Sequence, residues 1–241
     1  MLYLIGIGLW DEKDISLKGV DAAKNCDAVY LEQYTGIWHG GAAALEKTIG
    51  KKISVLEREK VESNFLINEA KNKDVALLIP GDPLAATTHF ELFYQCKKQW
   101  IECIVIHASS IYTAIAITGL QLYKFGRTTT LAKPHKNYIP ESPYDVITEN
   151  KRVGLHTLVL LDTAQGGMTI KEGVELLQSM EEKRKEGLLD DKIIAAARLG
   201  SENPIIRYGH ADDLLMEEKP AVIIIPGTLN FKEEEALGLW L

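Results

Sequence analysis

Cysteine is scarce in this sequence, and no apolar stretch approaches the length that a membrane span requires. The 3 cysteines among 241 residues, Cys26, Cys96 and Cys103, are an odd number without metal-ligand spacing. Cysteines of this kind are typical of small buried hydrophobic side chains in a reducing cytosol. The opening apolar segment has no basic residues ahead of it and ends at Asp11, so no signal peptide is predicted. We therefore expect a soluble, cytoplasmic protein without a membrane partner.

Positive charge is also in short supply. Lysine and arginine together number 27 against 34 acidic residues, which gives a formal net charge of −7. A nucleic-acid-binding protein normally carries a basic surface, so this balance argues against a nucleic-acid partner. The content of 46% hydrophobic and 25% charged residues is that of an ordinary globular protein. The chain is long enough to bury a large core in one domain or two.

The sequence further lacks the patterns of a metal site and of covalent catalysis. Its 6 histidines form no H-x-x-x-H motif and no Cys/His cluster, so we expect no metal. No serine stands in a G-x-S-x-G setting, and no cysteine has a local partner that would activate it. A reaction that depends on positioning an already activated cofactor needs neither device.

One stretch, residues 74–91, combines a buried strand with a stiff turn. Residues 75–79 form a continuous apolar run of the kind found in strands that are buried on both faces. Pro80 ends the pairing of this strand because it has no N–H to donate. Gly81 can adopt backbone angles closed to other residues, which lets a ligand approach the main chain. Such a turn is where an open α/β sheet presents a ligand site.

Asp82 follows in this turn and has two interpretations. It could be an ordinary turn residue, or its carboxylate could face a cationic ligand group such as an ammonium or a sulfonium. Pro83 pushes Asp82 towards an extended conformation, and this stiffening favours the second interpretation. Further on, Thr88 and Glu91 have the spacing of a capping box, which predicts that a helix starts there.

Strands and helices alternate along the first half of the chain, which predicts a mostly parallel sheet. The expected strands cover residues 2–7, 28–32, 54–56, 75–79 and 101–106. The expected helices cover residues 16–25, with Ser16 as N-cap, 62–73 and 89–98, and a further one over 112–117 that ends at Gly119.

The composition changes after this point. Residues 124–143 are polar and carry several prolines, which indicates a changeover into a second domain. The expected elements beyond it are strands over 128–130, 154–161, 192–197 and 221–225 and a helix over 172–185. We therefore predict an α/β fold with an N-terminal domain over residues 1–112, which carries the Gly-Asp-Pro loop, and a C-terminal domain over 113–241.

Gly6-Ile7-Gly8 follows the first expected strand and invites a dinucleotide-binding interpretation. That fingerprint needs a third glycine three residues after the second, and Asp11 occupies the position. A phosphate would meet a carboxylate there, so a simple strand-end turn is at least as well supported. The missing third glycine argues against a nicotinamide-dependent oxidoreductase, which is kept as one alternative. A non-catalytic binding module is another.

Several segments occur in an order shared with one enzyme family. They are Y-L-I-G-I-G-L, P-G-D-P-L-A-A-T-T-H, H-A-S-S-I-Y-T-A-I-A-I-T-G-L-Q-L-Y-K-F-G, G-L-H-T-L-V-L-L-D and A-R-L-G-S. These segments run from residue 2 to about residue 227. Through them the chain resembles the diphthine synthase family. This family belongs to the tetrapyrrole methylase-like class (class III) of S-adenosylmethionine-dependent methyltransferases. G-D-P alone indicates only the wider class, whereas its continuation into A-T-T-H is more specific.

The resemblance implies two α/β domains with S-adenosyl-L-methionine bound in a cleft between them, and a homodimer. It also implies a protein substrate, translation elongation factor 2. In the family, the amino group of an aminocarboxypropyl-modified histidine of that factor is methylated to diphthine, a step of diphthamide biosynthesis. The nearest alternative is an enzyme of the same class that methylates a precorrin or another small molecule.

The matching motifs also imply cofactor contacts. Carried over position by position, these are Leu9, Asp82, Ala85, Ser110, Ile111, Leu161, Leu199 and Ala221. Several of these contacts are expected to use backbone atoms. The contacts of Ala85, Leu199 and Ala221 can form only through the main chain. No residue is predicted as a catalytic base. We expect catalysis by proximity and desolvation, with Asp82 orienting the cofactor and the substrate amine shedding its proton in the cleft.

Four basic residues, Lys124, Arg127, Lys133 and Lys136, could form an edge for an acidic partner. A solvated loop is the simpler interpretation of the same residues.

Overall fold

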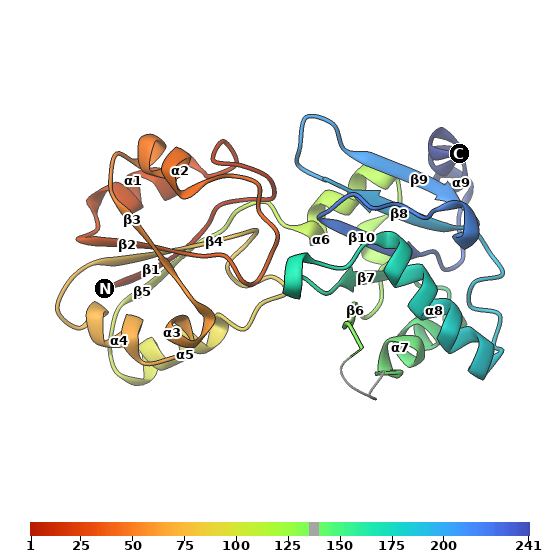
Figure 1. Ribbon diagram of the computed structural model, residues 1–241, viewed down its shortest axis with the longest axis horizontal. Helices are drawn as coiled ribbons and strands as arrows, with labels where there is room; N and C mark the ends of the chain where they lie inside the picture. Colours follow the sequence, from red (N-terminus) through yellow and green to blue (C-terminus); the bar gives the residue numbers. More distant parts are fainter. Residues whose placement is uncertain (135–139) are drawn as a thin grey trace. The chain divides into compact units, whose positions relative to one another are not determined.

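The computed structural model describes residues 1–134 and 140–241 (Figure 1). The chain forms two compact units, Met1–Tyr112 and Thr113–Leu241. Each unit is built from one β-sheet with helices, so the expected α/β class is confirmed. The polar stretch that was expected to mark the changeover lies inside the second unit, because β6 (Thr129–Leu131) pairs with a strand of that unit.

The first unit contains a parallel sheet with the strand order β3-β2-β4-β1-β5, as the alternation of strands and helices predicts. Its strands are β1 (Leu2–Gly6), β2 (Ala28–Glu32), β3 (Ile53–Leu56), β4 (Val75–Ile79) and β5 (Cys103–Ile106). Its helices are α1 (Leu17–Asn25), α2 (Ala42–Ile49), α3 (Arg58–Val61), α4 (Phe65–Ala70) and α5 (Phe90–Lys98). The chain passes into the second unit within α6 (Ile111–Ala114).

Helices cover both faces of this sheet, and each face has its own apolar core (Figure 1). Leu4 of β1 packs in the core that includes residues of α4 and α5, whereas Ile5 packs in the core that includes residues of α1 and α2. The five residues of β4 are fully buried, because this central strand has helices on both sides. That position explains the continuous apolar run. The three cysteines are free and buried, as expected.

The second unit contains a mixed sheet with the strand order β6-β7-β10-β8-β9. Strand β10 runs antiparallel to both of its neighbours, and β6 pairs with β7 in parallel. The remaining strands are β7 (Thr157–Leu161), β8 (Ile193–Ala197), β9 (Ile205–Gly209) and β10 (Ala221–Ile225). The helices are α7 (Ser142–Arg152), α8 (Ile170–Arg184) and α9 (Phe231–Leu237), with 3-10 turns η1 (Ile115–Thr118), η2 (Leu122–Lys124), η3 (Ala164–Gly166), η4 (Ala211–Asp213) and η5 (Gly238–Trp240).

The main core of this unit lies between the sheet and helices α7 and α8. Val159 and Ile223, from neighbouring strands, are buried together with Tyr144 of α7 and Leu177 of α8. Alternate residues along the strands therefore face the two helices.

Some local predictions are wrong. Helix α5 begins at Phe90 with His89 as its N-cap, and no side chain caps it, so the predicted Thr88–Glu91 capping box does not form. The hydroxyl of Thr87 instead lies 2.5 Å from Nδ1 of His89 and orders this turn locally. The helix predicted over residues 62–73 is replaced by the two short helices α3 and α4. Among the α-helices and strands of the described residues, α2, α7, β9 and α9 were not predicted.

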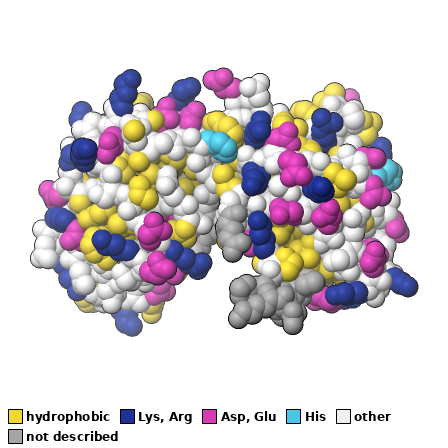
Figure 2. All heavy atoms as spheres, viewed as in Figure 1, with side chains coloured by type: hydrophobic (Ala, Val, Ile, Leu, Met, Phe, Trp, Pro, Cys, Tyr) yellow, Lys and Arg dark blue, Asp and Glu magenta, His cyan; other side chains and the backbone are white. Residues whose placement is uncertain are grey.

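Charges of both signs are interspersed on the face drawn in Figure 2. Each described member of the predicted basic edge pairs with a carboxylate, and the acidic partner stays a prediction. The pairs are Lys124 with Glu233, Arg127 with Glu149, and Lys133 with Glu172. Lys136 lies outside the described residues. None of the helices in the described ranges has both the length and the apolar character needed to cross a bilayer.

Replacing Leu77 in the middle of β4 by Ala should lower the free energy of unfolding by about 2–5 kcal/mol, because it opens a cavity in the core of the first unit. Urea unfolding followed by circular dichroism measures this loss. The matched control is Val55→Ala on the edge strand β3, whose side chain is 47% exposed. Equal losses in the two variants would contradict the central position of β4.

Candidate functional site

The turns that follow β1, β4 and β5 are packed against one another at the carboxyl edge of the first sheet. The N–H of Gly81 donates to the carbonyl of Gly8 at 2.7 Å, and the N–H of Gly8 donates back at 3.3 Å. A Cβ atom on Gly6 would lie 2.6 Å from the carbonyl oxygen of Gly81 and 2.7 Å from Cβ of Ala108. Only glycine at position 6 therefore allows the three turns to approach so closely.

Gly81 itself leaves space at this edge. Its φ of +71° requires a left-handed backbone, and a Cβ placed there would meet no atom within 4 Å. The main chain of the turn after β4 is thus open to an approaching group, as the sequence predicted.

The carboxylate of Asp82 does not stand free. Its Oδ1 accepts a hydrogen bond from the N–H of Leu84 at 3.0 Å, as in an Asx turn. Its Oδ2 accepts one from the N–H of Ala108 at 3.2 Å and lies 2.7 Å from Nδ1 of His107. With its side chain only 11% exposed, Asp82 joins the turn after β4 to the turn after β5. These contacts give Asp82 the role of a turn residue, and its contact with a cationic group stays a prediction.

Leu9 lies in the turn after β1, which is held by a second aspartate. The N–H groups of Leu9 and Trp10 donate to Oδ2 of Asp14 at 3.1 and 2.7 Å. A Cβ on Gly8 would lie 2.2 Å from Cβ of Asp14, so the small residue lets this carboxylate reach the turn.

The other predicted contacts of the first unit lie in the same set of turns. Ala85 follows Asp82 and donates its N–H to the Asp82 carbonyl at 3.2 Å. Ser110 is buried after β5, and its hydroxyl accepts from the N–H of Tyr112 at 3.3 Å. Ile111 begins α6. The structure thus places these residues, with Leu9, after the three strands that end at one sheet edge.

The predicted contacts of the second unit also share one edge of their own sheet. Leu161 ends β7, Leu199 follows β8, and Ala221 begins β10, which is antiparallel to both strands. The N–H of Arg198 donates to the carbonyl of Pro220 at 2.8 Å and joins the turn after β8 to the start of β10. Sequence motifs far apart in the chain are therefore brought to one place within this unit.

A buried polar cluster that the sequence did not indicate lies at the end of β2. Glu32 is fully buried and accepts hydrogen bonds from the N–H groups of Tyr34 and Thr35 at 2.9 and 3.1 Å. The hydroxyl of Tyr34 lies 3.3 Å from Nε2 of His89. Burial raises the pKa of Glu32 and lowers the pKa of His89 to about 4, so His89 is neutral at pH 7.

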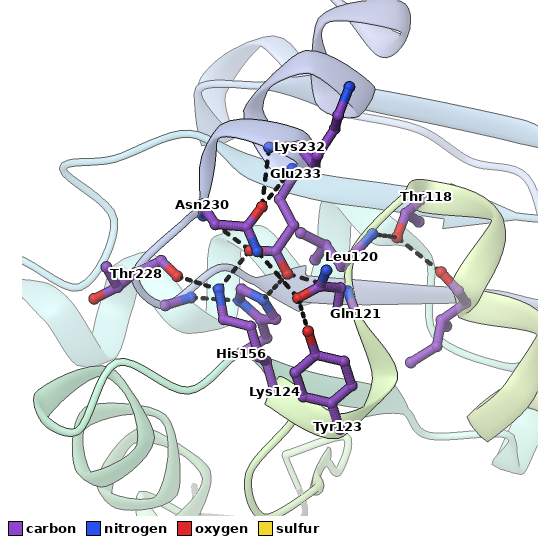
Figure 3. A network of polar contacts seen from close by, with 12 residues as sticks. Thr118, Leu120, Gln121, Tyr123, Lys124, His156, Thr228, Asn230, Lys232 and Glu233 are labelled. Carbon is purple, nitrogen blue, oxygen red and sulfur yellow. Dashed lines mark hydrogen bonds and ion pairs between the residues drawn. The ribbon is translucent and has the colours of Figure 1, made fainter.

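A second buried cluster centres on Glu233 of α9 (Figure 3). Its carboxylate accepts hydrogen bonds from the Lys124 ammonium and from the N–H groups of Gln121 and Asn230, and lies 3.0 Å from Nε2 of His156. Although burial alone would raise the pKa of Glu233, these hydrogen bonds lower it to about 2. The cluster fastens η2 to α9 and makes His156 a structural histidine.

The ring of His156 has a defined tautomer in this cluster. Nδ1 accepts a hydrogen bond from the N–H of Gly227 at 2.9 Å, so Nε2 carries the proton and donates it to Glu233. Burial lowers the pKa of His156, so the ring is neutral at pH 7.

The comparison with known proteins identifies the family of the chain. Residues 1–215 match the family of tetrapyrrole (corrin/porphyrin) methylases. The chain belongs to this family. The methylase is 50% identical to a diphthine synthase from Methanococcus aeolicus, over 98% of this chain and 96% of the relative. It is 47% identical to a diphthine synthase from Methanocaldococcus jannaschii, over 98% and 97% of the two chains.

The fold of the chain is also similar to a solved structure of the same kind of enzyme as these relatives. A crystal structure of diphthine synthase superposes with a TM-score of 0.92 and 34% identity, covering 99% of the methylase and 95% of that chain. The resemblance based on motifs is confirmed, and the methylase is an enzyme that transfers a methyl group. The oxidoreductase and binding-module alternatives are therefore wrong. Across the described part of the methylase, no three His, Cys, Asp or Glu residues are grouped so that they could hold a metal ion.

Replacing Glu233 by Gln should destabilise the second unit by roughly 3 kcal/mol at pH 7, because the Lys124 ammonium loses its partner in a largely buried site. The loss should shrink on acidification. A carboxyl group in an unfolded chain has a pKa of about 4.3, so the ionised Glu233 stabilises the fold fully above that value. This contribution is lost as the pH falls towards the folded pKa of about 2.

Urea unfolding at pH 7 and at pH 3 measures both effects. The neighbouring Glu234 is exposed, so Glu234→Gln provides the control and should leave the free energy of unfolding nearly unchanged. A deficit in Glu233→Gln that is as large at pH 3 as at pH 7 would show that the charge of Glu233 is not what stabilises the cluster.

Proposed function

We propose that this methyltransferase uses S-adenosyl-L-methionine to methylate translation elongation factor 2. The acceptor is the amino group of an aminocarboxypropyl-modified histidine, and the product is diphthine, in diphthamide biosynthesis. The observation that carries this function is the 50% identity to a diphthine synthase over nearly the whole of both chains. The A-T-T-H continuation of the Gly-Asp-Pro loop, at residues 86–89, points to the same protein-directed branch.

The turns of the first unit fit a methyl donor of this kind. The main chain at Gly81 faces open space, and glycines at positions 6 and 8 keep the neighbouring turns close. We propose that the donor contacts Leu9, Asp82, Ala85, Ser110 and Ile111 of this unit, mostly through main-chain groups. The contacts proposed for the second unit are Leu161, Leu199 and Ala221. When bound, S-adenosyl-L-methionine supplies a methyl group that its sulfonium has already activated.

The chain itself must then align the acceptor amine and keep water away. An amine can attack only with a free lone pair, and an ammonium has none. Removal from water disfavours the charged form of an amine, so a desolvated site lowers its pKa and helps it to lose the proton. Correct alignment of two bound reactants can account for a large part of the rate enhancement, about 7–11 kcal/mol in favourable cases.

We further propose that the enzyme works as a homodimer in the cytoplasm. The family resemblance supports the homodimer. The buried free cysteines are consistent with a reducing compartment.

Transfer of a labelled methyl group from S-adenosyl-L-methionine tests this function. The acceptors are elongation factor 2 carrying the aminocarboxypropyl-histidine, the unmodified factor, and a precorrin. Label should appear on the modified factor and not on the other two, because only that acceptor presents the amine. Label on the precorrin instead would contradict the proposed substrate and favour a small-molecule methyltransferase.

A further inference from the structure

His107 stands at the end of β5 with an exposed ring that a buried carboxylate holds in place. Its side chain is 68% exposed, whereas that of Asp82, 2.7 Å from Nδ1, is 11% exposed. The carboxylate cannot turn away from the ring, because the N–H groups of Leu84 and Ala108 hold both of its oxygens. A mobile surface histidine would have no such support.

The pairing decides which ring nitrogen can accept a proton. An ionised carboxylate only accepts hydrogen bonds, so Nδ1 of His107 carries the hydrogen and Nε2 of the neutral ring keeps its lone pair. Within the described ranges, no protein group is hydrogen-bonded to this Nε2. A carboxylate that fixes the tautomer of an imidazole is also the arrangement by which catalytic triads prepare a histidine as a base.

The other histidines near this edge are less suited to the task. His89 is buried, and its pKa is lowered to about 4, which makes it a weak base. His39 is stacked on the ring of Trp10 with the ring centroids 3.9 Å apart. His107 combines an exposed side chain, a ring held by Asp82 and a position among the turns proposed to hold the methyl donor.

We propose that His107 is a catalytic base, which accepts the proton that the substrate ammonium must lose before each methyl transfer. This role presupposes the methyl transfer to an amine proposed above. The N–H bond of the ammonium breaks, its electron pair stays on nitrogen, and the proton binds to Nε2. The amine then forms the N–C bond, while the C–S bond breaks and its electron pair remains on sulfur. The imidazolium returns its proton to solvent, and Asp82 acts as the positioning residue.

The informative substitution is His107→Asn. The Asn amide can still donate a hydrogen bond to Asp82, but it offers no basic nitrogen in place of Nε2. We expect the single-turnover rate of methyl transfer to the modified factor, at saturating donor, to fall by about 10²-fold or more. The dissociation constant of S-adenosyl-L-methionine, measured by calorimetry, should stay within about threefold of the original value, a change below 1 kcal/mol.

Chemical rescue separates a base from a structural residue. Imidazole added to His107→Ala should restore the rate in proportion to its concentration, because it can supply the missing base from solution. The control is His210→Asn, an exposed histidine of the second unit, which should transfer methyl groups at the original rate.

Two results would overturn this role. One is a rate of methyl transfer to the modified factor that is similar in His107→Asn and in an active wild-type enzyme. The other is a slow His107→Ala that imidazole does not restore. If the wild-type enzyme itself transferred no methyl group to the factor, the proposed function would fail first, and the role of His107 with it.

Discussion

The paired main chains of Gly8 and Gly81 are the constraint on which the candidate site depends. Their reciprocal hydrogen bonds bring the turn after β1 against the turn after β4, and the missing side chain of Gly6 admits the turn after β5. Once the three turns are in contact, Asp82 can reach His107 across two strand ends. Carboxylate, imidazole and open main chain therefore occupy one edge because three glycines leave room for them.

Polar groups in the two units are used in contrasting ways. Glu233 and His156 are buried and hydrogen-bonded on all sides, so they fasten segments of the second unit together. Glu32 and His89 form a similarly buried cluster in the first unit. Asp82 and His107 differ, because only the carboxylate is withdrawn from solvent. The buried clusters therefore hold segments of the fold together, whereas the ring of His107 stays exposed to solvent.

Local patterns predicted much of the first unit, and non-local contacts explain what they missed. Ser16 caps α1 and β2 covers residues 28–32, as expected, since both depend on neighbouring residues. Asp82 and His107 are 25 positions apart in sequence, so no local pattern indicated that they pair. Thr88 does not cap α5, because the helix begins later, with His89 as its N-cap. The family motifs supplied the reaction, which periodicity could not.

We propose that the carboxyl edge of the first sheet binds the methyl donor through main-chain groups. A crystal structure with S-adenosylhomocysteine, the demethylated donor, tests it most directly. We expect the ligand to lie against the turn at residues 81–85 and against residues 110–111, with Asp82 still bonded to His107. A ligand bound elsewhere, or one that pulls the Asp82 carboxylate away from His107 to itself, would contradict it.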